Sequence, residues 1–360
     1  MRCIENLDRI NYPKELVYDL TKLYTFKGKD FYYEDVLKQY MQQIIKNTIE
    51  HDVFAAAKIL GLEVNENRLK LIVKKGSEPK TKHERIVKNL KEVFQIIQKN
   101  GVDLELTSNE FLMLGSKVFN GVHRFSYLID TVTEMDNILE GRKKVSRRDH
   151  VDKEIVDYSN AKNKFKVEIT QVITNFYVDM LNMQCFDMQN SFISLMICYC
   201  LLFSERFNVF KYSSFFEYYY KHMADFRKYE EESKYGWETG FANTTELNKA
   251  IIEMMLDGYR QVEKMVSDFE FDKRLRKVDN VEGVIMKLGN VFTREDIKAK
   301  VPNLSDSTIN RALVKLRDEG KIRPDGTGRS AKWIRLVPEE MFTGGVQQYN
   351  IFDFMKPDED

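Results

Sequence analysis

The stretch Gln184-Cys185-Phe186-Asp187-Met188-Gln189-Asn190-Ser191 leads into the most apolar run of the chain, Phe192-Ile193-Ser194-Leu195-Met196-Ile197-Cys198-Tyr199-Cys200-Leu201-Leu202-Phe203. A helix that is apolar on nearly every side has to be covered from several directions, so this run predicts a central helix wrapped by other helices. At about 12 residues it is typical of a buried core helix and too short to cross a bilayer. We expect Asn190 and Ser191 to cap this helix, whose N-terminus would offer free backbone N–H groups to an anion.

The overall composition is that of a globular protein without an obvious charged partner. The 360 residues include 56 basic and 56 acidic side chains, which cancel, and 43% of the residues are hydrophobic. Two or three domains are expected at this length. The four cysteines form no Cys-x-x-Cys pair, so we expect free thiols and no metal site. The absence of a signal peptide and of a run of about 18 apolar residues predicts a cytoplasmic protein without a membrane span.

The distribution of proline predicts a mainly α fold. No proline occurs between Pro79 and Pro302, and the segment between them shows helical periodicity, so we expect a continuous helical body. The densest basic cluster of the chain, residues 141–150, falls inside it. We interpret this cluster as a solvated loop before a helix, with a phosphate-binding surface as the alternative.

From Val281 onward the pattern predicts a small α+β domain. Thr293 and Ser305 are expected to cap two successive helices, and the second of these buries Ile309, Ala312, Leu313 and Leu316 at helical spacing. Gly320 ends that helix, and residues 321–324 and 332–336 are expected to form two short strands. This order resembles a winged helix-turn-helix over residues 281–336.

The predicted winged helix carries a moderate positive charge that favours DNA as its partner. Residues 281–336 contain twelve basic and seven acidic side chains, a net charge of +5. In a helix-turn-helix the recognition helix meets base edges and basic groups meet phosphates. The candidate DNA-binding residues are Ser307, Thr308, Asn310, Arg311, Lys315, Arg329 and Lys332. The alternative is a protein-docking or dimerisation module.

The domain order as a whole resembles that of Fic-domain proteins, from about residue 10 to residue 336. We divide the chain into an N-terminal helical region (1–80), a Fic-like helical core (81–270), the winged helix (281–336) and an acidic tail (337–360). The segment Asn47-Thr48-Ile49-Glu50 resembles the inhibitory helix of that family, with Glu50 in the place of its blocking glutamate. The serine or threonine that usually precedes this glutamate by four residues is Lys46 here.

The family signature, H-P-F-x-x-G-N-G-R-x-x-R, falls on residues 184–195 but is degenerate. Only Phe186 and Asn190 are kept. The histidine that acts as general base becomes Gln184, whose amide does not titrate, and the acidic metal ligand becomes Met188. The glycines that approach phosphate become Gln189 and Ser191, and the two arginines become Phe192 and Leu195. The resemblance therefore implies a phosphate-cradling site whose catalytic groups are absent.

Three functions remain open at this point. The first is a non-catalytic Fic-like regulator that contacts DNA through its winged helix, while its helical body senses a signal, dimerises or binds a protein partner. The second is a divergent protein adenylyltransferase, which would need ATP and Mg²⁺ and a base such as His150 or His222. The third is an interaction scaffold. We expect no cofactor for the first and third, a homo-oligomer, and residual anion binding only through Asn190 and Ser191 at the helix N-terminus.

Overall fold

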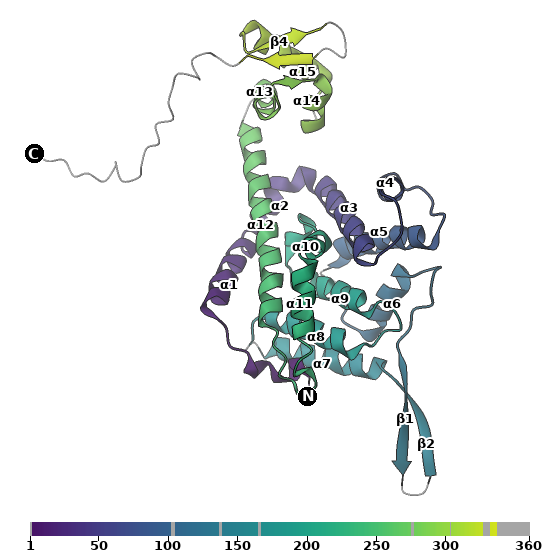
Figure 1. The fold of residues 1–360 in the computed structure, drawn as a ribbon. Helices are drawn as coiled ribbons and strands as arrows, with labels where there is room; N and C mark the ends of the chain where they lie inside the picture. Colours follow the sequence, from purple (N-terminus) through teal and green to yellow (C-terminus); the bar gives the residue numbers. More distant parts are fainter. Residues whose placement is uncertain are drawn as a thin grey trace, which may run out of the picture. The chain divides into compact units, whose positions relative to one another are not determined.

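The computed structural model describes residues 2–101, 105–136, 139–164, 167–274, 277–302, 304–326 and 332–336. The chain folds into two compact units, residues 1–266 and 267–360. The first is helical apart from one β-hairpin (Figure 1). Its helices are η1 (Cys3–Arg9), α1 (Lys14–Lys27), α2 (Asp30–Leu37), η2 (Lys38–Tyr40), α3 (Met41–Ile59), α4 (Glu66–Lys75), α5 (Lys82–Asn100), α6 (Ser108–Val118), α7 (Arg148–Asn163), α8 (Ile169–Met183), α9 (Asn190–Ser204), η4 (Asn208–Lys211), α10 (Phe215–Lys221), α11 (Met223–Glu232), η5 (Trp237–Thr239) and the long α12 (Thr245–Arg274), which continues into the second unit.

Helix α9 is the buried centre of the first unit, as the sequence predicts. Every residue from Phe192 to Phe203 is buried. Tyr199 lies among five other aromatic rings at centroid distances of 5.0 to 6.2 Å, those of Phe94, Phe203, Phe210, Phe215 and Phe216. Its hydroxyl accepts a hydrogen bond from the Gln98 amide. Aromatic packing of this kind stabilises the core beyond the burial of apolar area alone.

The first residues of the chain are anchored to α8 by a buried carboxylate. Asp179 is fully buried, and its two oxygens accept the backbone N–H groups of Cys3 at 3.1 Å and Ile4 at 2.9 Å. The Trp237 indole N–H donates to the same carboxylate. Nearby, Arg2 Nη1 donates a hydrogen bond to Oε2 of the fully buried Glu154 at 3.0 Å. The N-terminal 3₁₀ helix is therefore part of the fold and fixes one side of α8.

One β-hairpin interrupts the helical body, and here the sequence-based expectation is wrong. Strands β1 (Ile129–Asp136) and β2 (Leu139–Ser146) pair antiparallel, with Ile129 opposite Ser146, and the hairpin projects away from the helices in Figure 1. The basic cluster expected in a loop lies in β2 and in the first turn of α7. A lack of proline is compatible with a strand as well as with a helix, and the β-branched alternation in residues 129–133 favours a strand.

The second unit packs helices against a small antiparallel sheet. Its elements are α13 (Lys277–Lys287), β3 (Val291–Phe292), α14 (Arg294–Lys300), α15 (Asp306–Asp318), β4 (Ile322–Asp325) and β5 (Lys332–Arg335), with the sheet order β3-β5-β4. Thr293 and Ser305 cap α14 and α15 through their hydroxyls, as predicted. The core of this unit consists of Val281, Val284, Ile285, Phe292, Ile297, Ile309, Ala312, Leu313, Leu316 and Ile322. This α+β arrangement agrees with the predicted fold class.

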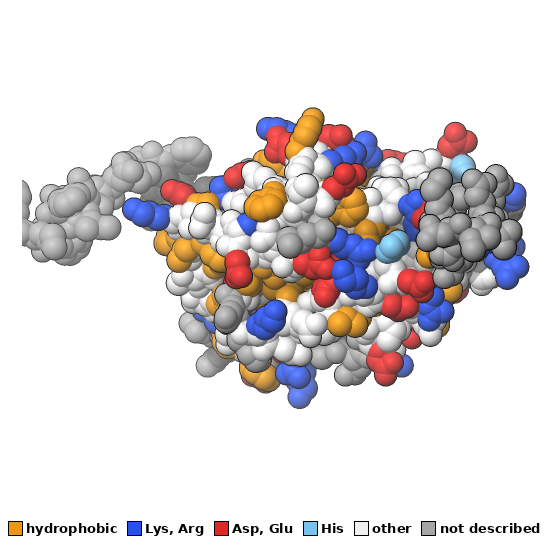
Figure 2. Space-filling view, turned by 90° about the horizontal axis from the view of Figure 1, so that it is seen from below, with side chains coloured by type: hydrophobic (Ala, Val, Ile, Leu, Met, Phe, Trp, Pro, Cys, Tyr) orange, Lys and Arg blue, Asp and Glu red, His pale blue; other side chains and the backbone are white. Residues whose placement is uncertain are grey.

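The surface shows no dominant charge on the face drawn in Figure 2, where acidic and basic side chains are interspersed with hydrophobic ones. This agrees with the balanced composition of the chain. Among the described residues, none of the helices combines the length and the apolar character needed to cross a membrane.

Candidate functional site: the loop before α9 and the exposed face of α15

The loop between α8 and α9, residues 184–189, is bounded by two residues with left-handed backbone geometry. Gln184 and Gln189 both have φ of 48°. Among non-glycine residues of the described chain, only Arg206 shares a positive φ. A side chain is disfavoured in this region, where glycine is the usual residue. Gln189 therefore stands in a backbone geometry that glycine would adopt at lower cost.

Asn190 closes this loop through its side chain. The amide is buried, and its Oδ1 accepts the Phe186 N–H at 3.2 Å. Its Nδ2 donates to the carbonyls of Met180 and Leu181, each at 3.2 Å. The expectation that Asn190 and Ser191 cap α9 is wrong, because Gln189 occupies the N-cap position and makes no side-chain bond there. Asn190 is engaged with the protein itself, whereas Ser191 is exposed at the helix N-terminus.

The segment before the hairpin pairs with the loop as a short extended strand. Tyr127 and Phe186 form an antiparallel bridge, Leu128 N–H donates to Cys185 O, and Asp187 N–H donates to Ser126 O. The Asp187 carboxylate accepts from His123 Nε2 at 2.9 Å and from Ser126 Oγ at 3.1 Å. Burial tends to raise the pKa of Asp187, but these hydrogen bonds outweigh it and the pKa is lowered overall. The loop is therefore held from one side by a charge-assisted network.

Phe186 anchors the loop in a row of aromatic rings. It lies 5.2 Å from both Phe125 and Tyr127, and Phe125 in turn lies 5.8 Å from Phe119, all as centroid distances. Helix α6 approaches this row at Gly115, where an added Cβ would come within 2.2 Å of the Phe125 ring. Only glycine fits at this contact. Phe186 thus packs the loop against α6 through the Phe125 ring.

Arg147 belongs to the basic cluster 141–150 and stabilises the same loop where it leaves the C-terminus of α8. Its Nη1 donates to the carbonyls of Met183 at 3.1 Å and Gln184 at 2.8 Å, and its guanidinium pairs with Asp130 at 2.8 Å. The carbonyls at a helix C-terminus lack intrahelical partners, so a cation there is favourable. Arg147 caps α8, a role that neither sequence-based interpretation of the cluster included.

A polar pocket opens where residues 184–195 meet α11, and we call it the motif-loop pocket. It is lined by Ile59, Leu181, Gln184, Gln189, Ser191, Phe192, Leu195, Tyr219, Arg227, Glu230, Glu231 and Lys234. The structure thus brings Gln184, Ser191, Phe192 and Leu195 together, while Met188 is half-buried and outside the lining. Gln184 Nε2 donates to Leu181 O at 2.7 Å, and an amide in this place does not take up a proton.

The charged groups of this pocket come from α11 and the turn after it, and they were not found from the sequence. Arg227, Glu230 and Glu231 share one side of α11, and Lys234 follows in the turn after the helix ends. Glu230 is buried, and its carboxylate accepts the hydroxyls of Tyr177 at 2.7 Å and Tyr219 at 2.9 Å. Burial raises the pKa of Glu230, which the two tyrosine hydroxyls partly oppose. Helical spacing was the available signal, but nothing in it places α11 beside residue 184.

The other predicted site residues of the first unit lie apart from this pocket. Glu50 is buried and pairs with Lys74 of α4 at 3.6 Å. His222 stacks on Tyr218 at 4.3 Å and lines a different groove, and His150 is an exposed residue of α7. His123 is the histidine that reaches the loop. Within the described residues, no group of three or more His, Cys, Asp or Glu side chains is arranged to hold a metal ion.

In the second unit, α15 presents a polar face to solvent. Ser307, Arg311 and Lys315 are exposed on it, and Thr308 and Asn310 are half-buried. Thr308 and Ser307 hydroxyls both contact Ser305 Oγ, and Lys315 lies 3.6 Å from Glu319. Lys332 is exposed at the start of β5, and Arg329 lies outside the described residues. The structure therefore brings the helical members of the predicted DNA-binding set onto one side of α15.

Comparison with known proteins assigns the fold. No protein-family model matches the sequence, and no curated protein matches it. The arrangement of helices nevertheless defines a Fic-like fold. A solved structure of a Fic family protein from Desulfovibrio desulfuricans G20 is similar to this chain with a TM-score of 0.53 and 10% sequence identity, over 91% of this chain and 97% of that one. At this identity the likeness concerns the fold.

Proposed function

We propose that this chain is a Fic-like protein that has lost AMP transfer and acts as a regulator, with its second unit binding DNA as a winged helix. The loss of AMP transfer is proposed from the loop between α8 and α9, residues 184–189. Its scaffold is kept by Asn190, Phe186 and the left-handed Gln189, while the position of the general base holds Gln184. The geometry of the loop therefore persists without a titratable group at the base position.

The DNA-binding half rests on α15. The exposed Ser307, Arg311 and Lys315 follow the N-terminal cap of a helix that packs against α13 and the small sheet. This is the place where recognition helices carry base-contacting residues. The net charge of +5 over residues 281–336 favours contact with phosphates.

DNA binding is tested by fluorescence anisotropy of the full chain with a mixed-sequence duplex at about 50 and 200 mM salt. The Arg311→Ala/Lys315→Ala variant is expected to bind at least about tenfold more weakly, with a salt slope reduced by about one per lost phosphate contact. The matched control is Lys70→Ala/Lys75→Ala, which removes two exposed charges from α4. Binding that is unchanged in the first variant contradicts the proposal. Dimerisation through 281–336 without DNA binding favours the scaffold.

A second candidate function is a divergent protein adenylyltransferase. It is favoured by one observation, the motif-loop pocket, whose lining combines Ser191 with Arg227 and the buried Glu230 of α11 and with Lys234 just after that helix. The test is transfer of label from α-labelled ATP and Mg²⁺ to protein hydroxyls. We expect no transfer. Transfer that is lost in both Gln184→Ala and Glu230→Gln, but kept in the control Glu92→Gln, would replace the first function with this one.

A further inference from the structure

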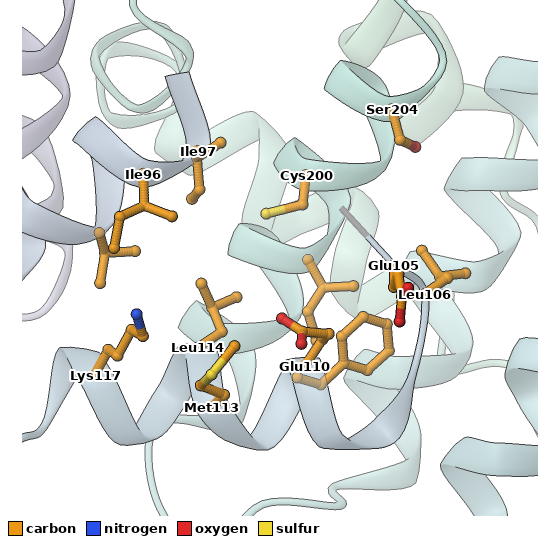
Figure 3. A pocket seen from close by; sticks show the side chains of 13 residues that line it. Ile96, Ile97, Glu105, Leu106, Glu110, Met113, Leu114, Lys117, Cys200 and Ser204 are labelled. Carbon is orange, nitrogen blue, oxygen red and sulfur yellow. The ribbon is translucent and has the colours of Figure 1, made fainter. Parts of the chain in front are cut away.

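An apolar pocket of the first unit lies between α5, α6 and α9, but it is too small for a ligand. Figure 3 shows Ile96 and Ile97 on one side of the space and Met113 and Leu114 on the other. The cavity holds about 60 Å³, whereas small-molecule sites typically occupy roughly 300–1,000 Å³. This pocket is a gap in the packing of three helices. A surface suited to a partner is found instead on α15 of the second unit.

Helix α15 exposes a strip of residues that combines cations with an apolar side chain. Ser307, Arg311, Val314 and Lys315 follow one another at helical spacing and are all exposed. We call them the α15 strip. Val314 is 44% exposed and follows Arg311 by three residues, so the two side chains are neighbours on the helix surface. The strip can therefore take a partner that is both acidic and apolar.

The guanidinium of Arg311 is open to an anionic partner. Its Nε donates to the Ser307 carbonyl at 3.4 Å, and within the described residues no carboxylate forms an ion pair with it. Lys315 lies 3.6 Å from Glu319, an exposed contact of the kind that contributes little to stability. A guanidinium binds carboxylate and phosphate oxygens through the same pair of N–H groups. An acidic segment and the DNA backbone would therefore compete for Arg311.

The chain itself carries a segment of matching chemistry directly after residue 336. Residues 337–360 lie outside the described residues, and their sequence contains six acidic side chains and one basic one, a net charge of −5. This opposes the charge of +5 over residues 281–336. Within the segment, Ile351-Phe352-Asp353-Phe354-Met355 joins apolar side chains to a carboxylate. The acidic segment thus complements the α15 strip in charge and in apolar character.

The acidic segment is long enough to reach the strip. Leu336 N–H donates to the Lys321 carbonyl at 2.8 Å, so the described chain ends beside the turn that follows α15. Arg311 lies seven residues before Asp318, the last residue of α15, which is about 10 Å along the helix axis. An extended chain covers about 3.3 Å per residue, so residues 337–355 can span several times this distance. A tether of this kind gives an effective concentration on the order of 1 mM.

We propose that the acidic segment 337–360 docks on the α15 strip and competes there with DNA. Phe352 and Phe354 lie against Val314, and the neighbouring carboxylates pair with Arg311 and Lys315. This inference rests on the proposed DNA binding of the second unit. At an effective concentration of about 1 mM, a contact with a Kd of about 0.1 mM keeps the segment docked about 90% of the time and weakens DNA binding about tenfold.

The contact is tested without DNA by zero-length carbodiimide cross-linking of the full chain, which joins a lysine to a carboxylate only where the two touch. Mass spectrometry of the monomer band should find Lys315 joined to residues 337–360. Arg311→Glu should reduce this product at least about threefold, because a like charge then faces the acidic segment. Lys70 of α4, which is exposed, is the control and should not be joined to the segment. Absence of the Lys315 product, or an equal product at Lys70, overturns the proposal.

The competition is tested by fluorescence anisotropy of the full chain with a mixed-sequence duplex at about 50 mM salt. The variant Asp353→Asn/Asp358→Asn/Glu359→Gln should bind DNA about fivefold more tightly than the parent, because it loses three of the carboxylates that hold the segment on the strip. The matched control removes three exposed carboxylates from the first unit and should change the affinity less than about twofold. It carries the substitutions Glu15→Gln, Glu92→Gln and Glu238→Gln.

A second variant, Phe352→Ser/Phe354→Ser, separates docking from general repulsion of DNA by the acidic segment. It leaves the net charge unchanged and should still tighten DNA binding about threefold, because the apolar contact with Val314 is lost. Tighter binding in the charge variant alone would mean repulsion without docking and would overturn the proposal. So would variants that bind DNA no more tightly than the parent. If no protein binds DNA although the Lys315 product forms, the proposed function fails and the competition with it, whereas the docking itself is supported.

Discussion

Asn190 at the start of α9 and Phe186 in the loop before it are bonded to each other: Asn190 Oδ1 accepts the Phe186 backbone N–H at 3.2 Å. The Phe186 ring packs against Phe125 in a row of aromatic rings, and Asn190 Nδ2 donates hydrogen bonds to the carbonyls of Met180 and Leu181. These two residues thus fix the shape of the loop through packing and hydrogen bonds.

Replacing Asn190 with alanine should destabilise the first unit. The change removes the acceptor of the buried Phe186 N–H and a donor to the Met180 and Leu181 carbonyls, at a cost of roughly 2–4 kcal/mol in the free energy of unfolding. Urea unfolding followed by circular dichroism measures it. Asn67→Ala, at an exposed position of α4, is the control and should change the free energy by less than about 0.5 kcal/mol. Equal effects of the two changes would contradict the structural role of Asn190.

Gln189→Gly should stabilise the protein. The backbone at Gln189 has φ of 48°, and a side chain in left-handed geometry costs roughly 1 kcal/mol relative to glycine. Thermal and urea unfolding should both show a gain of that order. The same substitution in the middle of α5, Gln95→Gly, should instead lose roughly 0.5–1 kcal/mol, because glycine disfavours a helix interior. A loss in both variants would mean that the loop does not need left-handed geometry.

Gly115→Ala should destabilise the contact between α6 and the aromatic row. The new Cβ would lie 2.2 Å from Phe125, and an overpacked core usually loses about 1–3 kcal/mol. Gly28→Ala is the matched control, since its Cβ would meet nothing closer than 3.4 Å. Both variants are compared by urea unfolding. If Gly115→Ala were as stable as the control, the close approach of α6 to Phe125 would be incorrect.

The parent protein should lose stability as the pH rises, and the variant Glu154→Gln should lose less. Burial, together with the neighbouring Asp179, raises the pKa of Glu154, and Arg2 only partly opposes this. The unfolded state has an ordinary glutamate pKa of about 4.3, so above that value the folded state holds a proton that the unfolded state has released. Stability then falls as pH rises, by up to about 1.4 kcal/mol per pH unit, until the folded-state pKa is passed.

The measurement is the free energy of unfolding at about pH 6 and about pH 9, for the parent, Glu154→Gln and the exposed control Glu92→Gln. The parent and the control should lose stability over this interval because Glu154 keeps its proton in the folded state. Glu154→Gln should lose less, because it has no proton to release on unfolding. A fall of the same size in all three proteins would show that Glu154 is ionised in the folded state.

The sequence alone determined the features that depend on local pattern. The uniformly apolar run 192–203 required a covered central helix, and hydroxyl residues before apolar-periodic segments located the caps at Thr293 and Ser305. The resemblance of the element order to Fic-domain proteins predicted the Fic-like fold that the structural comparison shows.

Only the tertiary structure decided which residues meet around the loop. The hairpin of β1 and β2 depends on strand pairing, which proline counts do not report. Arg147 donates a hydrogen bond to the Gln184 carbonyl, and His123 contacts the Asp187 carboxylate. Helix α11 contributes Arg227 and Glu230 to the motif-loop pocket, which Gln184 also lines. These contacts join segments far apart in the chain, and periodicity describes one segment at a time. Asn190 does not cap α9, because its side-chain amide bonds to α8 and to the loop and not to its own helix. The sequence pattern does not show which of these partners the amide takes.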